Sequence, residues 1–506
     1  LSMKLLLRLG AIAVVLLVVL FLFIWLTVPL NVPWRSMLQQ AGVLPRWLDP
    51  QPMTVVRMVE RLRVPEGYGL GLFAEGVTEA RGLTVTVVGD VLVSTPRDGR
   101  VLLLHADTDA DGEADGQSVL LDGLARPNGL AVRDGYLYVG EEDGVGRVPF
   151  DVETGSTTGE YRRIIEGLPP GGNHWKKTIR FGVDGLLYLA VGSSCNVCIE
   201  EDSRRGAILR YTAEGEFVDI FATGLRNSGG FDWSPATGTL YATDNGRDLL
   251  GDEFPPCELN EVVAGGFYGW PFVNGRNVPD PDFGDVQSAV MEAAIPPVHE
   301  FQPHNAPLGI VFFRHDRHPP EYRGAAAVAL HGSWNRSEKD GYKVVSLHFA
   351  SDGSIEERDF LTGFLVNDEA IGRPADVAEG PDGSVYVSDD LGGAVYRIRF
   401  NTVTDKTLTV STPRPSSGYD SRVIGAEERQ NALAIGSSIL ADKDCLVCHA
   451  RADEQADDRF VLRDLRTKYT VDELSAFLVN PRQPMPPYEA DRESRRALAI
   501  FLLESF

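Results

Sequence analysis

The residues with the most specific chemistry form the motif Cys445-Leu446-Val447-Cys448-His449. A C-x-x-C-H motif is the attachment signature of a c-type haem. Two thiols three positions apart can each form a thioether to a haem vinyl group, and the next imidazole can bind the iron. Met485, in the proline-rich segment 480–487, is the expected second axial ligand, and His–Met ligation raises the haem potential. A redox disulfide or half a zinc site are the alternative interpretations of the cysteine pair.

Helices are expected on both sides of this motif. A helix carrying Gly436 and Ile439 leads into it, a helix at about 471–479 precedes the Met485 loop, and an apolar-periodic helix covers 497–503. With these elements, residues 425–506 resemble a small class I cytochrome c domain. The resemblance implies an all-α, one-electron carrier that binds haem c. Residues 401–424 contain Thr, Ser and Pro clusters and are predicted to be a linker.

The middle of the chain, residues 61–400, repeats one pattern in which a turn pair precedes a short apolar strand. The six turns are at 89–90, 134–135, 184–185, 237–238, 322–324 and 382–383. Asp-Gly between alternating strands is a strong hairpin signal. Recurrence every ~45–60 residues, with one longer gap, predicts propeller blades of four strands each.

The predicted fold class is therefore mainly β: a six-bladed β-propeller with an N-terminal transmembrane helix and a C-terminal all-α cytochrome domain. A β-sandwich array would not keep one turn signature in register. The longer gap, about residues 246–320, is rich in Pro and Gly and is predicted to be a long excursion on one face of the propeller.

Several further motifs occur in a fixed order along this region. They lie at 171–185, 191–198, 224–230, 243–253, 269–271, 331–336 and 372–377. In this order they resemble the glucose/sorbosone dehydrogenase family, six-bladed propellers that bind pyrroloquinoline quinone (PQQ). The resemblance covers roughly residues 60–400. It implies an oxidoreductase that uses PQQ and calcium and acts on a CH–OH group or an aldehyde hydrate of a sugar-like substrate.

The resemblance also implies a set of site residues. His174 lies where the family carries its catalytic base, and a neutral imidazole can accept the substrate hydroxyl proton as hydride leaves carbon. PQQ is a planar trianion, and guanidinium forks match its carboxylates. The residues expected to bind it are Arg226, Asn227, Arg336, Arg373 and Lys177. Oxygen ligands suit calcium, and those expected near the quinone belong to Asp244, Gly246, Arg247, Asp252 and Glu253.

One position departs from the soluble glucose dehydrogenase branch of the family. That branch has Arg four positions after the catalytic His, where this chain has Thr178. The sorbosone-like branch tolerates the change, so glucose is not implied as the substrate. Cys195 and Cys198 recur in the sorbosone-like branch. A structural disulfide is favoured over a zinc half-site because no second ligand pair appears, and Cys257 is then unpaired.

A second metal candidate is an acidic loop in the first blade. Its carboxylates alternate around the Gly112 turn, as in a calcium loop. The candidate ligands are Asp107, Asp109, Asp111 and Asp115. Ser118 occupies the twelfth position, so the loop is not an EF-hand. The alternative interpretation is a bare acidic hairpin tip.

Residues 1–30 are predicted to be a transmembrane anchor. Segment 9–28 carries no charge and is as long as the ~20 residues that span a bilayer. Lys4 and Arg8 favour a cytoplasmic N-terminus. A cleaved signal peptide is the alternative. Residues 31–60 are predicted to be a juxtamembrane segment. This places the chain in the inner membrane, crossing it once, with the propeller and the cytochrome domain on the periplasmic side.

Together these features predict a membrane-anchored quinoprotein dehydrogenase fused to its own electron acceptor. Electrons would pass from the quinone through the haem to a respiratory-chain acceptor or a larger membrane complex. Two alternatives are a quinone-free docking or electron-transfer subunit and a calcium-dependent lactonase-like hydrolase. The net charge of −24 and the lack of a basic patch argue against nucleic acid as a partner.

Overall fold

The computed structural model describes residues 58–400, except 286–288 and 290–291. In the C-terminal part it describes 426–442, 449–451, 460–462, 465, 471–479, 488 and 490–505. The chain divides between Val403 and Thr404 into two compact units, and each is described by itself.

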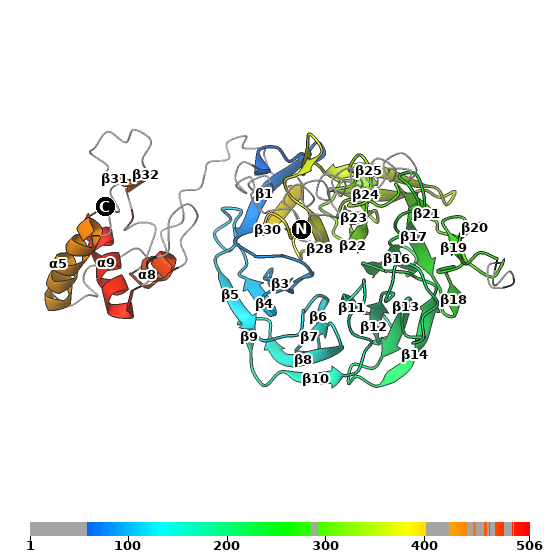
Figure 1. Cartoon of the computed structure of the whole chain (residues 1–506), viewed down its shortest axis with the longest axis horizontal. Coiled ribbons are helices and arrows are strands. Elements are labelled where there is room, and N and C mark those ends of the chain that lie inside the picture. Colours follow the sequence, from blue (N-terminus) through cyan, green and yellow to red (C-terminus); the bar gives the residue numbers. More distant parts are fainter. Residues whose placement is uncertain are drawn as a thin grey trace, which may run out of the picture. The chain divides into compact units, whose positions relative to one another are not determined.

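The first unit is a six-bladed β-propeller, and its blades follow one another around a ring (Figure 1). Each blade is a sheet built on four antiparallel strands in the order from the ring centre outward. The first two blades are β2 (Leu83–Val85), β3 (Val91–Thr95), β4 (Arg100–Leu104), β5 (Gln117–Leu121), and β6 (Leu130–Arg133), β7 (Tyr136–Glu141), β8 (Gly144–Asp151), β10 (Arg162–Ile165), with β9 (Ser156–Thr157) also on β8. The third is β11 (Lys177–Phe181), β12 (Leu187–Val191), β13 (Ala207–Tyr211), β14 (Phe217–Thr223), with β18 (Gly266–Phe267) parallel to β14.

The other three blades complete the ring. They are β15 (Phe231–Trp233), β16 (Leu240–Asp244), β17 (Cys257–Val262), β21 (His299–Phe301); β22 (Pro307–Phe312), β23 (Ala326–Leu330), β24 (Lys343–Phe349), β25 (Ile355–Leu361); and β28 (Pro374–Glu379), β29 (Val385–Asp389), β30 (Ala394–Phe400), β1 (Tyr68–Glu75). Small elements lie in the connections between strands. Hairpin β19 (Val273–Asn274) with β20 (Val278–Pro279) lies between β17 and β21, the 3-10 helix η2 (Pro320–Tyr322) lies between β22 and β23, and hairpin β26 (Leu365–Val366) with β27 (Glu369–Ala370) lies between the fifth and sixth blades.

The predicted turns fall at one equivalent place in every blade. Each joins the innermost strand to the second strand, for example Asp184-Gly185 between β11 and β12. Gly185 has φ +82°, a conformation that only glycine adopts without strain. The six-bladed prediction is confirmed. The predicted excursion at 246–320 is wrong in part, because β17 and β21 in that range form the outer half of the fourth blade.

The ring closes through the last blade, which combines the two ends of the propeller sequence. β1 forms its outermost strand and pairs with β30 from Tyr68 opposite Phe400 to Glu75 opposite Ala394. Tyr68 anchors this junction: it is buried, its ring packs edge-on against Phe360 and Phe400, and its hydroxyl lies 3.0 Å from Nδ1 of His318. The closing strand is thus held by aromatic packing as well as by backbone hydrogen bonds.

Tyr68→Ala is expected to lower the free energy of unfolding of the propeller by about 3–5 kcal/mol, because it removes a buried aromatic ring from the closing strand. Tyr68→Phe keeps the ring and loses only the hydrogen bond, so about 1–2 kcal/mol is expected. Chemical denaturation followed by tryptophan fluorescence measures both. Equal losses for the two variants would contradict the packing argument.

The second unit contains helices α5 (Ala426–Asp442), α8 (Val471–Val479) and α9 (Arg492–Ser505), and the parallel strand pair β31 (His449–Arg451) and β32 (Phe460–Leu462). The predicted helices therefore occur at their expected positions. α5 and α9 approach closely at Gly436, where an added Cβ would lie 2.2 Å from Cβ of Phe501. Apolar side chains from all three helices form the core of this unit.

Several predictions fall on residues outside the described ranges. These are the anchor at 1–30, most of the juxtamembrane segment, the linker at 401–424, and Cys445, Cys448 and Met485. Of His449 only the backbone is described, as the first residue of β31. Among the described residues, no helix is both long enough and apolar enough to cross a membrane.

Candidate functional site

The topology gathers the predicted site residues at one end of the ring. The innermost strands all run the same way through the ring, so the residues that precede them share one face. Residues that follow the second strands return to that face, because the two strands are antiparallel. The segment that ends at Lys176 precedes β11, Arg226 precedes β15 and Arg373 precedes β28, whereas Ser193 follows β12. This end of the ring is called the site face below.

The centre of the ring is nearly filled. A cavity of about 30 Å³ lies between the innermost strands, lined by residues from all six blades, among them Gly82, Gly129, Gly229 and Gly309. It has room for water only. Glycines are required because the strands approach closely: a Cβ on Gly309 would lie 2.0 Å from Oδ1 of Asp376. An organic ligand therefore has to bind above this cavity, at the site face.

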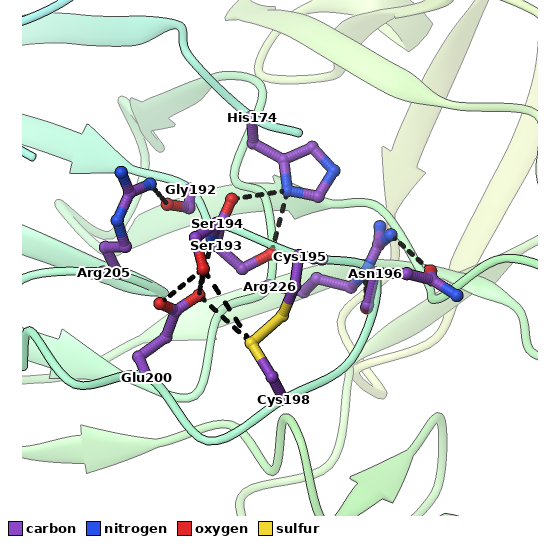
Figure 2. The surroundings of a disulfide bond; sticks show 10 residues. All are labelled: His174, Gly192, Ser193, Ser194, Cys195, Asn196, Cys198, Glu200, Arg205 and Arg226. Carbon is purple, nitrogen blue, oxygen red and sulfur yellow. Dashed lines mark hydrogen bonds between the residues drawn. A yellow bond between two sulfur atoms is a disulfide. The ribbon is translucent and has the colours of Figure 1, made fainter. Parts of the chain in front are cut away.

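His174 has one defined tautomer. Its Nδ1 lies 3.1 Å from the carbonyl oxygen of Ser193 and 2.9 Å from the Ser193 hydroxyl. A carbonyl only accepts, so Nδ1 carries the proton and donates it. In the neutral ring Nε2 then has a lone pair, and Figure 2 shows this nitrogen pointing away from the Ser193–Cys198 segment. The imidazole is arranged as a base.

The surroundings of His174 favour its uncharged form. Burial, followed by the charges of Arg226, Lys176 and Arg205, holds the pKa of His174 well below its usual range. Gly192 makes the position of the ring possible, because a Cβ there would lie 2.5 Å from Cβ of His174. His174 was predicted as the base from its motif; its Nδ1–H is fixed by Ser193, and its role as the base stays a prediction.

The segment beneath His174 contains the Cys195–Cys198 disulfide, which was predicted, and Cys257 is free and buried. The Ser193 hydroxyl donates to the carbonyl of Cys195 at 2.8 Å. The side chain of Glu200 accepts from the hydroxyl of Ser194 at 2.8 Å (Figure 2). The zinc half-site is thus not needed to explain the two cysteines.

Arg226 is buried, and the protein uses all five of its N–H donors. Nε donates to the carbonyl of Asn196, Nη1 to the carbonyls of Asn245 and Gly246, and Nη2 to Oδ1 of Asn196 and to Asp248. No donor remains for a cofactor carboxylate in this arrangement. Arg226 supplies charge to the site, whereas the predicted direct contact is not supported by its geometry.

Asn227 is placed differently from its neighbour. Its backbone N–H donates to Asp244, but its side-chain amide makes no hydrogen bond to another described residue. Oδ1 of Asn227 lies 3.0 Å from the position of a Cβ on Gly192, beside His174. This amide is available to a ligand next to the base.

Of two adjacent lysines, the structure turns Lys176 toward the ring centre. Side chains alternate along β11, so Lys176, Thr178 and Arg180 line the cavity, whereas Lys177 points into the blade. Lys177 has no exposed surface and donates to the carbonyl of Trp175 at 2.9 Å. The prediction that Lys177 binds the cofactor is therefore not supported, and sequence reasoning missed Lys176.

Lys176 makes no hydrogen bond or ion pair with another described residue. Burial, and then the charge of Arg81, lower the pKa of its ammonium group from 10.5 to about 7. Lys176 is partly buried, and a partly desolvated cation that forms no ion pair destabilises the free protein. It is suited to an anionic ligand.

A cluster of charged and polar side chains around Asp390 lies close to Lys176. Of this cluster, the sequence analysis predicted only Arg373 as a site residue. The Asp390 carboxylate is fully buried and accepts from Nε of Arg373 at 2.7 Å. It also lies 3.0 Å from Nε of Arg81 and 3.0 Å from Nε2 of His331. The two terminal nitrogens of Arg373 make no hydrogen bond to another described residue, and its side chain is 38% exposed. Arg373 can therefore still bind a carboxylate.

The predicted calcium ligands near the quinone are not brought together. Asp244 accepts the backbone N–H groups of Arg226 and Asn227, and burial raises its pKa to about 7. Arg247 forms a buried ion pair with Asp280 at 2.7 Å. The other three predicted ligands have different partners. The Gly246 carbonyl accepts from Arg226, the Asp252 carboxylate accepts the N–H of Ser337, and Glu253 is exposed.

Arg336 was predicted to bind the cofactor. Its guanidinium instead donates to the carbonyls of Asp252 and Pro303 and so connects two loops.

The acidic loop of the first blade has part of its predicted geometry. Oxygens of Asp107, Asp109 and Asp111 lie within 4.8 Å of one another. Asp115 instead accepts from the Thr108 hydroxyl, and Asp107 is paired with Arg397 at 2.8 Å. Calcium binding here stays a prediction.

Comparisons with known proteins identify the family to which the propeller belongs. Residues 82–397 match the glucose/sorbosone dehydrogenase family. The chain belongs to this family. An uncharacterized protein of Borreliella burgdorferi is 30% identical over 360 residues, which cover 68% of this chain and 92% of that protein. A PQQ-dependent pyranose dehydrogenase of Coprinopsis cinerea is 24% identical over 67% of this chain, which spans about half (54%) of that enzyme.

Solved structures show the same fold. The holo PQQ domain of the Coprinopsis cinerea pyranose dehydrogenase aligns with a TM-score of 0.57 and 21% identity, covering 69% of this chain and 98% of that domain. A calcium structure of a Trichoderma reesei enzyme of carbohydrate-active family AA12 aligns with a TM-score of 0.57 and 19% identity, covering 67% and 97%. Family relatives with an assigned activity are PQQ-dependent oxidoreductases that act on CH–OH groups of sugars.

Lys176→Met is expected to raise the free energy of unfolding of the quinone-free protein at about pH 6.5, by roughly 1–4 kcal/mol. The pKa of Lys176 is lower in the folded than in the unfolded chain, so its cost is full below about pH 7. The cost disappears as the pH rises toward 10.5. Urea denaturation at about pH 6.5 and pH 9.5 measures the gain, which is expected to shrink at the higher pH.

Lys343→Met is the matched control, because Lys343 pairs with Asp359 at the surface. It is expected to change stability by less than about 1 kcal/mol. A loss of stability in Lys176→Met at about pH 6.5 would show that Lys176 stabilises the fold instead.

Proposed function

We propose that the propeller oxidises a sugar-like alcohol or aldehyde hydrate with PQQ as the hydride acceptor. The observation that carries this proposal is the hydrogen bonding of the His174 imidazole: Nδ1 donates to the Ser193 carbonyl, which leaves the Nε2 lone pair without a partner among the described residues. Removal of a proton from a substrate hydroxyl near neutral pH needs such a base.

The described residues fit a flat, trianionic cofactor. Lys176 is a partly buried cation, and neither its ammonium group nor the two terminal nitrogens of Arg373 bond to another described residue. Charge-assisted hydrogen bonds from these groups would hold carboxylates. When bound, PQQ supplies the electrophilic centre that takes hydride from the substrate carbon.

The protein's own part in the reaction is proton transfer and orientation. His174 takes the hydroxyl proton at Nε2, while its Nδ1–H stays bonded to the Ser193 carbonyl and fixes the plane of the ring. The positive charges of Arg226 and Lys176 disfavour the imidazolium. The proton is therefore released again quickly, which returns His174 to its active form.

A calcium ion is part of the proposal, with ligands that differ from those expected from sequence. Asn245 Oδ1 is buried and accepts no hydrogen bond within the described residues. A side-chain carbonyl oxygen of this kind suits calcium. Asp244, in contrast, is occupied by two backbone N–H groups.

The C-terminal unit is proposed to be the electron acceptor of the propeller. Its C-x-x-C-H motif and Met485 would bind haem c, and residues 1–30 would anchor the chain in the inner membrane with both units on the periplasmic side. The haem would pass electrons to a respiratory-chain acceptor. Fusion makes the first transfer independent of a diffusional encounter.

His174→Ala is expected to lower substrate-driven reduction about 10²–10⁴-fold, because a positioned base typically contributes that much. The protein is loaded with PQQ and calcium, and reduction is followed at the haem absorption band over a panel of aldoses. PQQ binding, measured by equilibrium dialysis, is expected to persist. His348→Ala is the control, since His348 lies on β24 and binds the Glu321 carbonyl, away from the site face.

Three outcomes separate the alternatives. Equal rates in the wild type and His174→Ala would remove His174 from the role of base. A wild type that binds no PQQ and oxidises no substrate would favour a docking subunit. Lactone hydrolysis without quinone would favour the hydrolase.

Cys445→Ser combined with Cys448→Ser is expected to abolish covalent haem, because both thioethers are lost. Met485→Ala is expected to keep the haem and lower its potential. Haem staining after denaturing electrophoresis and a redox titration measure the two effects. Covalent haem in the double variant would end the cytochrome proposal.

A further inference from the structure

The loop closed by the Cys195–Cys198 disulfide contains Asn196, which binds the buried guanidinium of Arg226. Asn196 lies between Cys195 and Cys198, and its backbone carbonyl accepts from Nε of Arg226 at 2.8 Å. Its Oδ1 accepts from Nη2 of Arg226 at 2.8 Å and from the N–H of Asp248 at 2.8 Å, while its Nδ2 donates to the Asp248 carbonyl at 3.0 Å. Every polar group of the Asn196 side chain is used to fix Arg226 and the loop at 245–248.

The same loop also supports the base. The carbonyl of Cys195 accepts from the Ser193 hydroxyl at 2.8 Å, and that hydroxyl accepts from Nδ1 of His174 at 2.9 Å. The backbone N–H of Ser193 donates to the carbonyl of Arg226 at 2.8 Å. Figure 2 shows that His174 is hydrogen-bonded to Ser193 and Arg226 to Asn196, so both bind segment 193–196.

We propose that the disulfide-closed loop 195–198 is a positioning element that fixes His174 and Arg226 relative to each other, with Asn196 as its positioning residue. This inference rests on the proposed function, because it explains how the base keeps its tautomer and its charge environment. Asn196 is not a catalytic residue here, since it acts only through Arg226 and the 245–248 loop.

The position of the Arg226 guanidinium depends on its hydrogen-bond acceptors and on the limited backbone freedom of the disulfide loop. Arg226 is buried, and a guanidinium N–H without an acceptor in such a place is costly. Removing the Asn196 amide would free one Nη2 donor and the N–H of Asp248, so the guanidinium is expected to shift toward other acceptors or water. Opening the disulfide would restore backbone freedom to the same four residues.

Such a shift would act on His174. Burial and then Arg226, Lys176 and Arg205 lower its pKa, and no carboxylate is among the charged groups that act on it most strongly. Loss of a fixed Arg226 charge and entry of water would both raise the pKa of His174 toward its ordinary value. A larger fraction of the protein would then carry an inactive, protonated His174 below neutral pH.

The test uses the full-length chain with ¹⁵N-labelled histidine, without quinone. The ring signals of the nine histidines are followed by NMR from about pH 8 to pH 5, and His174→Gln identifies the signal of His174. In the wild type we expect a neutral ring with the proton on Nδ1 throughout. In Asn196→Ala and in the Cys195→Ser/Cys198→Ser double variant we expect His174 to become protonated within this pH range.

The loaded enzyme gives a second readout. In both variants the acid limb of the kcat/KM profile is expected to move to higher pH, and kcat/KM at neutral pH to fall about 10–100-fold. Ile199→Ala is the control, because Ile199 follows the loop, is 59% exposed and binds neither His174 nor Arg226. It is expected to match the wild type in both readouts.

The outcomes decide the inference separately from the proposed function. An unchanged His174 titration in a folded Asn196→Ala protein would overturn it, whatever the activity. If the cysteine variant does not fold, Asn196→Ala still decides, because it keeps the disulfide. If the wild type oxidises no substrate with PQQ, the proposed function fails, while the NMR titration still tests the loop.

Discussion

The site depends on one buried charge. Arg226 is the only described residue whose guanidinium binds both the disulfide loop and the 245–248 loop, and it uses all five donors to do so. Uncharged carbonyl oxygens accept from four of these donors, and the Asp248 carboxylate accepts from the fifth at 3.1 Å. The positive charge of Arg226 helps to keep His174 in the neutral form. The local packing and the chemistry of the base therefore have a common origin.

The fold was largely predictable because its signals are local. A turn pair before an apolar strand needs only a few residues, and six such signals gave the blade number. The prediction failed where strands and insertion are interleaved, since β17 and β21 are separated by a Pro- and Gly-rich segment that carries the hairpin of β19 and β20. Pattern alone does not show that Phe301 returns to pair with Cys257.

The site was predictable only in part. His174 and Asn227 were predicted from ordered motifs, and the disulfide from the recurrence of its cysteines and the lack of a second ligand pair. Lys177 was predicted in place of Lys176. Successive side chains of a strand point in opposite directions, so an error of one residue in the register of β11 exchanges the two lysines. Arg81 and Asp390 are separated by about three hundred positions, and no local spacing indicates that they meet. Asp244 was predicted to be a metal ligand. In a sequence, a carboxylate that binds backbone N–H groups cannot be distinguished from a carboxylate that binds a metal.

The closure of the ring has a mechanical consequence. β1 enters the last blade at Tyr68 and β30 leaves it at Phe400, and these two residues face each other. Tension applied through the flanking segments would therefore load the pairs one after another from that end, as when a zipper is pulled open, and would not shear the whole strand at once. The aromatic contact between Tyr68 and Phe400 lies at the first pair of these two strands to open, after the bridge between Arg63 and Thr362 has parted. This contact therefore increases the force needed to begin separating β1 from β30, compared with a strand held by hydrogen bonds alone.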